Sequence, residues 1–162
     1  MRNGSPTRLL VTGVPCAGKT TFARWLASEH AFTAFLADHD QNWTVDLVAA
    51  VNDGKDVILD YGIPAGSIPT VRQWLIQDLG FQAWWFDADP EASLEVFVAR
   101  QDHPATRADW VRYMDGLRTH ADEYASLYDD RVIRTLDSGP TRTMSDSEIL
   151  EHIKTYRGSH NV

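Results

Sequence analysis

The residues whose types and spacing most directly indicate chemistry lie near the amino end, in the stretch LLVTGVPCAGKTTFARWLA at positions 9–27. Within it, GVPCAGKT fits the pattern G-x-x-x-x-G-K-[ST], directly after an apolar run and directly before a helix-like one. In this context consecutive backbone N–H groups wrap nucleotide phosphates, and the positive end of the helix strengthens their attraction. We expect Lys19 to reach the β and γ phosphates and the Thr20 hydroxyl to hold Mg²⁺. The predicted nucleotide-binding residues of this phosphate loop are Gly13, Val14, Pro15, Cys16, Ala17, Gly18, Lys19, Thr20 and Thr21.

Two carboxylates follow the next apolar run, in the stretch FLADHDQNW. Asp38 and Asp40 come after a predicted strand, and ligands of open α/β sheets bind at the carboxyl ends of the strands. One carboxylate would accept a proton from an attacking hydroxyl, while the other would hold Mg²⁺ or its water. The D-x-D-x-N spacing also begins a calcium loop, but that loop requires Gly and Glu where Trp43 and Ala49 stand. The calcium interpretation is therefore excluded.

A further carboxylate and three arginines complete the set of candidate site residues. Asp60 ends the hydrophobic run DVILD, which is typical of a magnesium partner beside a phosphate loop. Arg100 and Arg107 flank the short break DHPAT, so we expect a lid at about 100–108 whose charges stabilise the transferring phosphoryl group and exclude water. Arg72 follows a Gly/Pro-rich loop and is a candidate contact for an anionic acceptor. The predicted metal-binding residues are Thr20, Asp60 and Asp40.

The elements that must position these residues alternate along the chain. We predict strands at 8–12, 32–37, 56–60, 82–87 and 131–137. We predict helices near 19–30, 42–52 and 69–79, another from Pro90, one long amphipathic helix carrying Trp110 to Tyr128, and a last one whose Ser145 and Glu148 have capping-box spacing. Strands separated by helices imply right-handed crossovers and a parallel sheet that is covered on both faces. The sequence therefore predicts a five-stranded, three-layer α/β domain spanning 1–162.

Composition narrows the class of protein. The 162 residues are 43% hydrophobic and 23% charged, which indicates one ordinary globular domain. The apolar runs are strand-sized, far below the ~20 residues of a membrane span, and no signal-peptide pattern precedes the first strand, so we expect a cytoplasmic monomer or homodimer. The net charge of −8 argues against a nucleic-acid partner.

The single cysteine, Cys16, excludes an intramolecular disulfide and a Cys-based zinc site. Its position allows two interpretations. It is either a small residue whose backbone alone matters, or a thiol at a helix N-terminus that is open to oxidation.

Together these motifs resemble the small P-loop kinases of the nucleoside-monophosphate-kinase fold, especially the branch with shikimate kinase, gluconate kinase, chloramphenicol phosphotransferase and the kinase part of polynucleotide kinase. GVPCAGKTT resembles their GxPGSGKST loop, FLADHD the end of their second strand, VILD their third strand, and DADPEASLEVFVARQ the helix leading into their lid. TLDSGPTRTMSDSEILEHI resembles their closing strand, adenine-side loop and last helix. The resemblance implies a P-loop NTPase fold with sheet order 2-3-1-4-5, ATP and Mg²⁺ as cofactors, and an adenine pocket lined by backbone from about Ser138 through Gly139 to Pro140.

The activity that the resemblance implies is phosphoryl transfer to a hydroxyl of a small molecule of the sugar, nucleoside or antibiotic type. Counting from Lys19 without gaps aligns Asp38 with the family's catalytic aspartate, while a gap would align Asp40 instead; we favour Asp38. Polynucleotide-type relatives often carry an arginine shortly after this aspartate. Here Gln41, Asn42 and Trp43 stand there, which argues against a phosphate-bearing acceptor.

Several alternatives stay open at this point. Trp43 either packs in the core or forms a platform for a ring-bearing acceptor. The chain could instead be a nucleoside-monophosphate kinase, a polynucleotide 5′-hydroxyl kinase, or an ATPase or switch that transfers no phosphoryl group.

Overall fold

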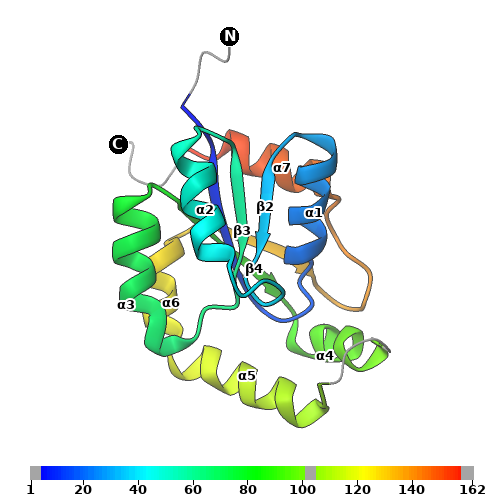
Figure 1. Ribbon diagram of the computed structural model, residues 1–162. Helices are drawn as coiled ribbons and strands as arrows, with labels where there is room; N and C mark the ends of the chain where they lie inside the picture. The colour runs from blue at the N-terminus through cyan, green and yellow to red at the C-terminus, as the bar shows by residue number, and fades with distance from the viewer. Residues whose placement is uncertain (1–4, 101–104, 158–162) are drawn as a thin grey trace. The chain divides into compact units, whose positions relative to one another are not determined.

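The computed structural model describes residues 5–100 and 105–157, and its strands form a five-stranded parallel sheet (Figure 1). The strands are β1 (Arg8–Gly13), β2 (Thr33–Leu36), β3 (Val57–Asp60), β4 (Gln82–Ala88) and β5 (Val132–Leu136). Their order across the sheet is β2-β3-β1-β4-β5, which confirms the order that the family resemblance implies.

Helices connect the strands throughout, as the alternating pattern predicts. They are α1 (Lys19–Glu29), α2 (Trp43–Asn52), α3 (Ile68–Val71), α4 (Pro90–Ala99), α5 (Arg107–Thr119), α6 (Ala121–Tyr128) and α7 (Asp146–Thr155). The predicted capping box at the start of α7 is present, because the Ser145 hydroxyl accepts the Glu148 N–H and the Glu148 carboxylate accepts the Ser145 N–H. None of the helices in the described part of the chain is long and apolar enough to cross a membrane.

Two helix predictions were wrong in detail. The segment predicted as one helix over 69–79 divides into α3 and a π-helical stretch, η2 (Arg72–Asp78), and a 3₁₀ turn, η1 (Ala65–Ser67), precedes it. The long helix predicted through Trp110 and Tyr128 breaks at His120, whose φ of −110° and ψ of 25° are not helical.

The periodicity hid this second break for a physical reason. The His120 N–H still donates to the Gly116 carbonyl, and the His120 carbonyl still accepts from the Tyr124 N–H. The spacing of apolar residues therefore continues across the break almost unchanged. Of the predicted lid at about 100–108, residues 101–104 lie outside the described residues.

The described residues form two compact units. The first contains residues up to Thr12 and the segment Lys19–Ala83. In it, α1 and α2 both pack on β2 and β3, and the paired strands place Phe35 opposite Leu59. The Leu59 side chain is fully buried, so the core of this unit lies directly behind the carboxyl ends of its strands.

The second unit contains the loop Gly13–Gly18 and the chain from Trp84 onward. The Trp84 side chain is 0% exposed and meets Tyr156 edge to face, whereas Trp85 stacks on Tyr128. Consecutive strand residues point to opposite faces, so the two tryptophans pack against different helices, as the alternation of a strand predicts.

Candidate active site

The two glycines of the phosphate loop are required for close approach and for backbone conformation. Gly13 has a φ of +126°, and a Cβ atom there would lie 2.2 Å from the Phe86 carbonyl oxygen. The neighbouring Val14 N–H donates to that same oxygen at 2.9 Å. Gly18 has a φ of +85°, and a Cβ atom there would lie 3.3 Å from Nε of Arg142. A side chain at Gly13 would therefore clash with the Phe86 backbone, whereas one at Gly18 would be strained by the positive φ and would press on the Arg142 side chain.

Two buried hydroxyls hold the carbonyl groups of the loop. Ser93 Oγ, on α4, donates to the Pro15 carbonyl at 2.7 Å and accepts from the indole Nε1 of Trp110, on α5, at 3.0 Å. Thr135 Oγ1, on β5, donates to the Ala17 carbonyl at 2.7 Å. These bonds fix the orientation of the Pro15 and Ala17 carbonyls, while the Val14 and Ala17 N–H groups donate within the protein, to the Phe86 and Val14 carbonyls. Sequence reasoning missed these hydroxyls, because a Ser within a helix and a Thr within a strand carry no motif.

The loop cysteine lies beside one of the predicted lid arginines. Cys16 is partly exposed and has a φ of +60°, and Nη1 of Arg100 lies 3.7 Å from its Sγ. Arg100 directly follows α4, so the end of this helix brings a guanidinium to the phosphate loop. Arg107 is the exposed first residue of α5.

In the first unit, the residue that completes the motif contacts the predicted strand-three carboxylate. Thr20 Oγ1 donates to Asp60 Oδ2 at 2.5 Å, and Asp60 is only 6% exposed at the end of β3. A hydroxyl and a carboxylate are hard oxygen donors of the kind that Mg²⁺ prefers. Among the described residues no group of three or more His, Cys, Asp or Glu side chains is arranged to hold a metal. The donor set thus fits an ion that takes its remaining ligands from phosphates and water.

The acidic turn after β2 lies against this pair. The Ala37 N–H donates to the Asp60 carbonyl at 2.9 Å. Asp38 directly follows Ala37, so this bond places Asp38 near the end of β3. Crowding by protein atoms raises the pKa of the Asp38 carboxyl above its ordinary value, and the negative charge of Asp60 raises it further. The positive charges of Lys19 and His39 oppose this rise. Asp38 is thus a solvent-accessible carboxyl that interacts electrostatically with both Lys19 and Asp60.

Asp40, the alternative to Asp38, has a local partner. Its Oδ1 accepts the Asn42 N–H at 2.9 Å, in the turn that leads into α2. This bond directs one carboxylate oxygen toward the backbone of its own turn.

Aromatic side chains gather beyond the acidic turn. Trp43, the first residue of α2, has its ring centroid 5.3 Å from Tyr61 and 5.9 Å from Trp74. All three are partly exposed. Tyr61 directly follows Asp60, and Trp74 lies in η2, which begins at Arg72. Of the two interpretations of Trp43, the structure thus shows a partly exposed ring in an aromatic cluster rather than a buried core residue.

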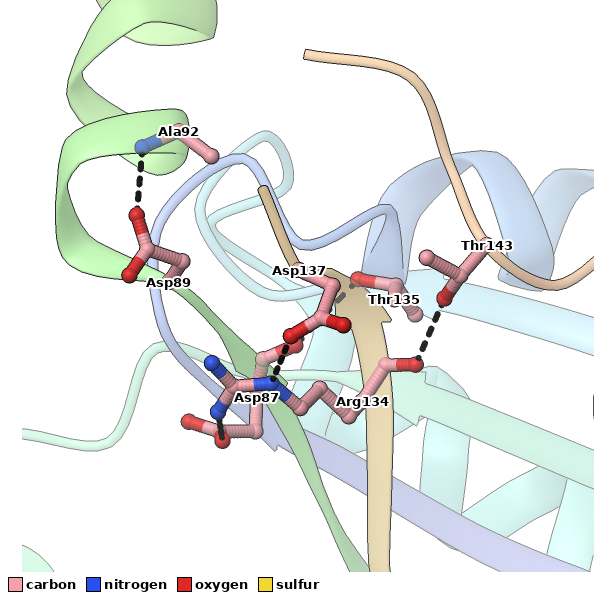
Figure 2. Close-up of polar contacts among 7 residues, drawn as sticks. All are labelled: Asp87, Asp89, Ala92, Arg134, Thr135, Asp137 and Thr143. Carbon is pink, nitrogen blue, oxygen red and sulfur yellow. Dashed lines mark hydrogen bonds and ion pairs between the residues drawn. The ribbon is translucent and has the colours of Figure 1, made fainter. Parts of the chain in front are cut away.

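The predicted adenine-side residues Ser138 and Gly139 lie in the loop between Asp137 and Thr143, two residues that Figure 2 shows beside Arg134 of β5. The guanidinium of Arg134 pairs with Asp87 Oδ2 at 2.7 Å and with Asp137 Oδ1 at 3.2 Å. At the returning end of the loop, Thr143 Oγ1 donates to the Arg134 carbonyl at 3.1 Å. Both ends of the loop are therefore fastened to β5.

Comparison with known proteins relates this geometry to solved kinases. No family model matches the sequence, and no curated protein sequence matches it. Among solved structures, shikimate kinase from Acinetobacter baumannii, solved in complex with shikimate, has a TM-score of 0.64 at 16% identity and covers 93% of this chain and 92% of its own. A gluconokinase from Sinorhizobium meliloti 1021 has a TM-score of 0.56 at 12% identity, covering 91% and 89%. Shikimate kinase from Bacteroides thetaiotaomicron has a TM-score of 0.53 at 13% identity, covering 91% and 94%. The chain therefore has the fold that these small P-loop kinases share.

Proposed function

We propose that this protein is an ATP- and Mg²⁺-dependent kinase that transfers the γ-phosphoryl group to a hydroxyl of a small molecule. The observation that carries the proposal is the Thr20–Asp60 contact of 2.5 Å, with Asp38 electrostatically coupled to the same Asp60. A phosphate loop alone indicates only nucleotide binding. A second carboxylate beside the metal-site carboxylate supports transfer, because it supplies a group that can accept the proton of an attacking hydroxyl.

In this mechanism the phosphate loop holds the donor and Lys19 neutralises charge on its β and γ phosphates. Thr20 and Asp60 would hold Mg²⁺, which when bound offsets the negative charge of the phosphates. Asp38 orients the acceptor hydroxyl and takes its proton as the bond to phosphorus forms. Little covalent chemistry is asked of the protein, because phosphoryl transfer depends mainly on positioning and electrostatics.

The raised pKa of Asp38 suits this role. A carboxylate of higher pKa holds a proton more strongly and is therefore a better base. We favour Asp38 over Asp40 because the Asp40 carboxylate already accepts the Asn42 N–H.

The remaining roles follow from charge and position. Arg100, beside the phosphate loop, and Arg107, at the start of α5, would stabilise the transferring phosphoryl group. Backbone at Ser138 and Gly139 would contact the adenine. We further propose that the chain acts as one catalytic domain, because the single phosphate-loop motif includes residues of both units, with Gly18 in the second and Lys19 in the first.

The test is to measure ADP release and phosphorylated product from MgATP across a panel of sugars, nucleosides, nucleotides, antibiotics and oligonucleotides. With the acceptor that is turned over, Asp38→Asn should lower kcat by about 10²–10⁴-fold, the usual contribution of a general base, without weakening MgATP binding. Asp46→Asn, at an exposed aspartate in the first turn of α2, is the matched control and should retain activity, and Asp40→Asn is measured as the alternative base.

Two results would contradict the proposal. An ADP release rate that no acceptor raises above hydrolysis by water would indicate an ATPase or switch. Full transfer activity in Asp38→Asn together with its loss in Asp40→Asn would exchange the two roles.

A further inference from the structure

The acceptor side of the first unit is aromatic rather than basic. Beyond Asp38 and Asp60, the ring of Trp43, at the start of α2, contacts Tyr61, directly after β3, and Trp74, in η2. We call these three residues the aromatic cluster. A ring-to-ring separation of 5.3 Å and an interplanar angle of 52° between Trp43 and Tyr61 are within the range of favourable aromatic contact. Each ring nevertheless keeps part of its surface open to solvent.

Positive charge is sparse at this edge. Of the basic side chains described in the first unit, Arg8 begins β1 and Lys55 precedes β3, so both lie toward the amino ends of strands, and Arg24 is exposed on α1. Lys19 serves the donor phosphates in the proposed function, which leaves Arg72 at the start of η2 and the imidazole of His39 beside Asp38. One guanidinium and one imidazole are a weak basis for binding an acceptor phosphate, which proteins commonly hold with several charged donors.

Two residues of the aromatic cluster, Tyr61 and Trp43, also lie close along the backbone to Asp60 and to the proposed base, Asp38. Tyr61 is the neighbour of Asp60, whose carbonyl accepts the N–H of the residue before Asp38. Trp43 begins α2, only five residues after Asp38, and the Asp40 turn sets where that helix starts. Trp74 is presented by a π-helical stretch, a rare geometry that is frequent at functional sites.

Resting on the proposed function, we propose that the acceptor is an uncharged alcohol carrying a planar unsaturated ring, and that Trp43 selects it by stacking. The hydroxyl of such an acceptor attacks the γ-phosphorus while its proton passes to Asp38 and ADP leaves. Trp43 is thus a specificity-determining residue, and Tyr61 and Trp74 position its ring. Nucleosides and aromatic antibiotics share this chemistry, whereas gluconate and other open-chain polyols lack it.

The test compares acceptors that offer the same hydroxyls with and without a planar unsaturated ring. Uridine and guanosine are paired with methyl β-D-ribofuranoside, which lacks the base. Chloramphenicol is paired with 2-(dichloroacetamido)propane-1,3-diol, which lacks the nitrophenyl ring, and gluconate is added as an open-chain polyol. Phosphorylated product is measured for the wild type, Trp43→Phe and Trp43→Ala. Trp25→Ala is the matched control, because Trp25 is also partly exposed but packs on Phe22 and His30 of the α1 region.

We expect a higher kcat/KM for at least one ring-bearing acceptor than for its ring-free partner. Trp43→Ala should raise KM for that acceptor about tenfold, equivalent to about 1.4 kcal/mol, because it removes the surface on which the ring stacks. Trp43→Phe should retain most of the preference, and Trp25→Ala all of it. A merely structural role of Trp43 would lower activity toward both members of a pair equally.

The outcomes separate this inference from the proposed function. Product from gluconate or methyl riboside at equal or higher efficiency, or an unchanged ring preference in Trp43→Ala, overturns the ring-bearing acceptor and leaves the kinase intact. No product from any acceptor, with MgATP still bound, overturns the kinase and this inference with it.

Discussion

The buried bridge from Trp110 through Ser93 to the Pro15 carbonyl offers a sharp test of how the phosphate loop is held. Ser93 is 0% exposed and Trp110 is 8% exposed, so solvent cannot replace a lost partner easily. Ser93→Ala removes the donor to Pro15 and the acceptor of the indole N–H at once. Each buried group left without a partner costs about 1–3 kcal/mol, so the two together should lower the free energy of unfolding by about 2–6 kcal/mol.

The assay is thermal and urea unfolding, with KM for ATP measured in parallel. For a chain of this size 1 kcal/mol shifts Tm by roughly 2–4 °C, so Tm should fall by at least about 4 °C. KM for ATP should rise as well, because the loop loses the bond that sets its carbonyl orientation. Ser28→Ala is the control, since its hydroxyl is exposed on α1 and its loss should change stability by less than about 0.5 kcal/mol.

A double variant separates hydrogen bonding from simple loss of packing. Trp110→Phe removes the N–H that Ser93→Ala leaves buried without an acceptor. The double variant should therefore be less destabilised than the sum of the two single variants, by about 1–3 kcal/mol. Strictly additive losses, or a Ser93→Ala variant as stable as Ser28→Ala, would refute the bridge as a support of the loop.

Three further predictions concern the loop, the metal site and the base. Gly13→Ala should abolish folding or ATP binding, because the new Cβ would lie 2.2 Å from the Phe86 carbonyl oxygen. Gly54→Ala is the control: Gly54 has a φ of +69° and open space around it, so this variant should lower the free energy of unfolding by only about 1–2 kcal/mol. Equal effects of the two variants in thermal unfolding would contradict the clash. Thr20→Val should weaken the apparent Mg²⁺ affinity at least about tenfold in a Mg²⁺ titration of activity, while Thr20→Ser should retain it. An unchanged Mg²⁺ affinity in Thr20→Val would contradict the proposal that this hydroxyl binds the metal. The raised pKa of Asp38 predicts that activity falls on acidification at a higher pH than an ordinary aspartate would give, and that Asp38→Asn abolishes this limb of the pH–rate profile. The same rise in pKa means that the folded state favours the protonated form of Asp38. The stability that this group contributes is therefore present below its ordinary pKa of 3.8 and is lost as the pH rises through the pKa of the folded state. Asp38→Asn should raise Tm at pH 7 but not near pH 3, and an equal change in Tm at both pH values would contradict the shift.

Patterns local in the sequence predicted much of this architecture. The phosphate loop, the five strands and the capping box at Ser145 depend on residues a few positions apart, so short-range rules suffice to find them. Asp60 was a candidate because a buried strand ending in a carboxylate is itself a local pattern, and the structure brings it to Thr20 across 40 positions. The break at His120 escaped prediction because the hydrogen bonds on either side preserve the helical spacing.

Contacts between residues distant in the sequence were decided only by the tertiary structure. Ser93 reaches Pro15 over 78 positions and Thr135 reaches Ala17 over 118 positions, and nothing in either neighbourhood signals a partner. The ring contacts that join Trp43 to Tyr61 and Trp74 are likewise products of packing. The chemistry proposed for the phosphate loop could be predicted from the sequence, because backbone N–H groups and one lysine at fixed spacing would perform it. The support of that loop and the character of the acceptor side depend on which side chains the folded sheet brings together, and residue order alone does not specify that.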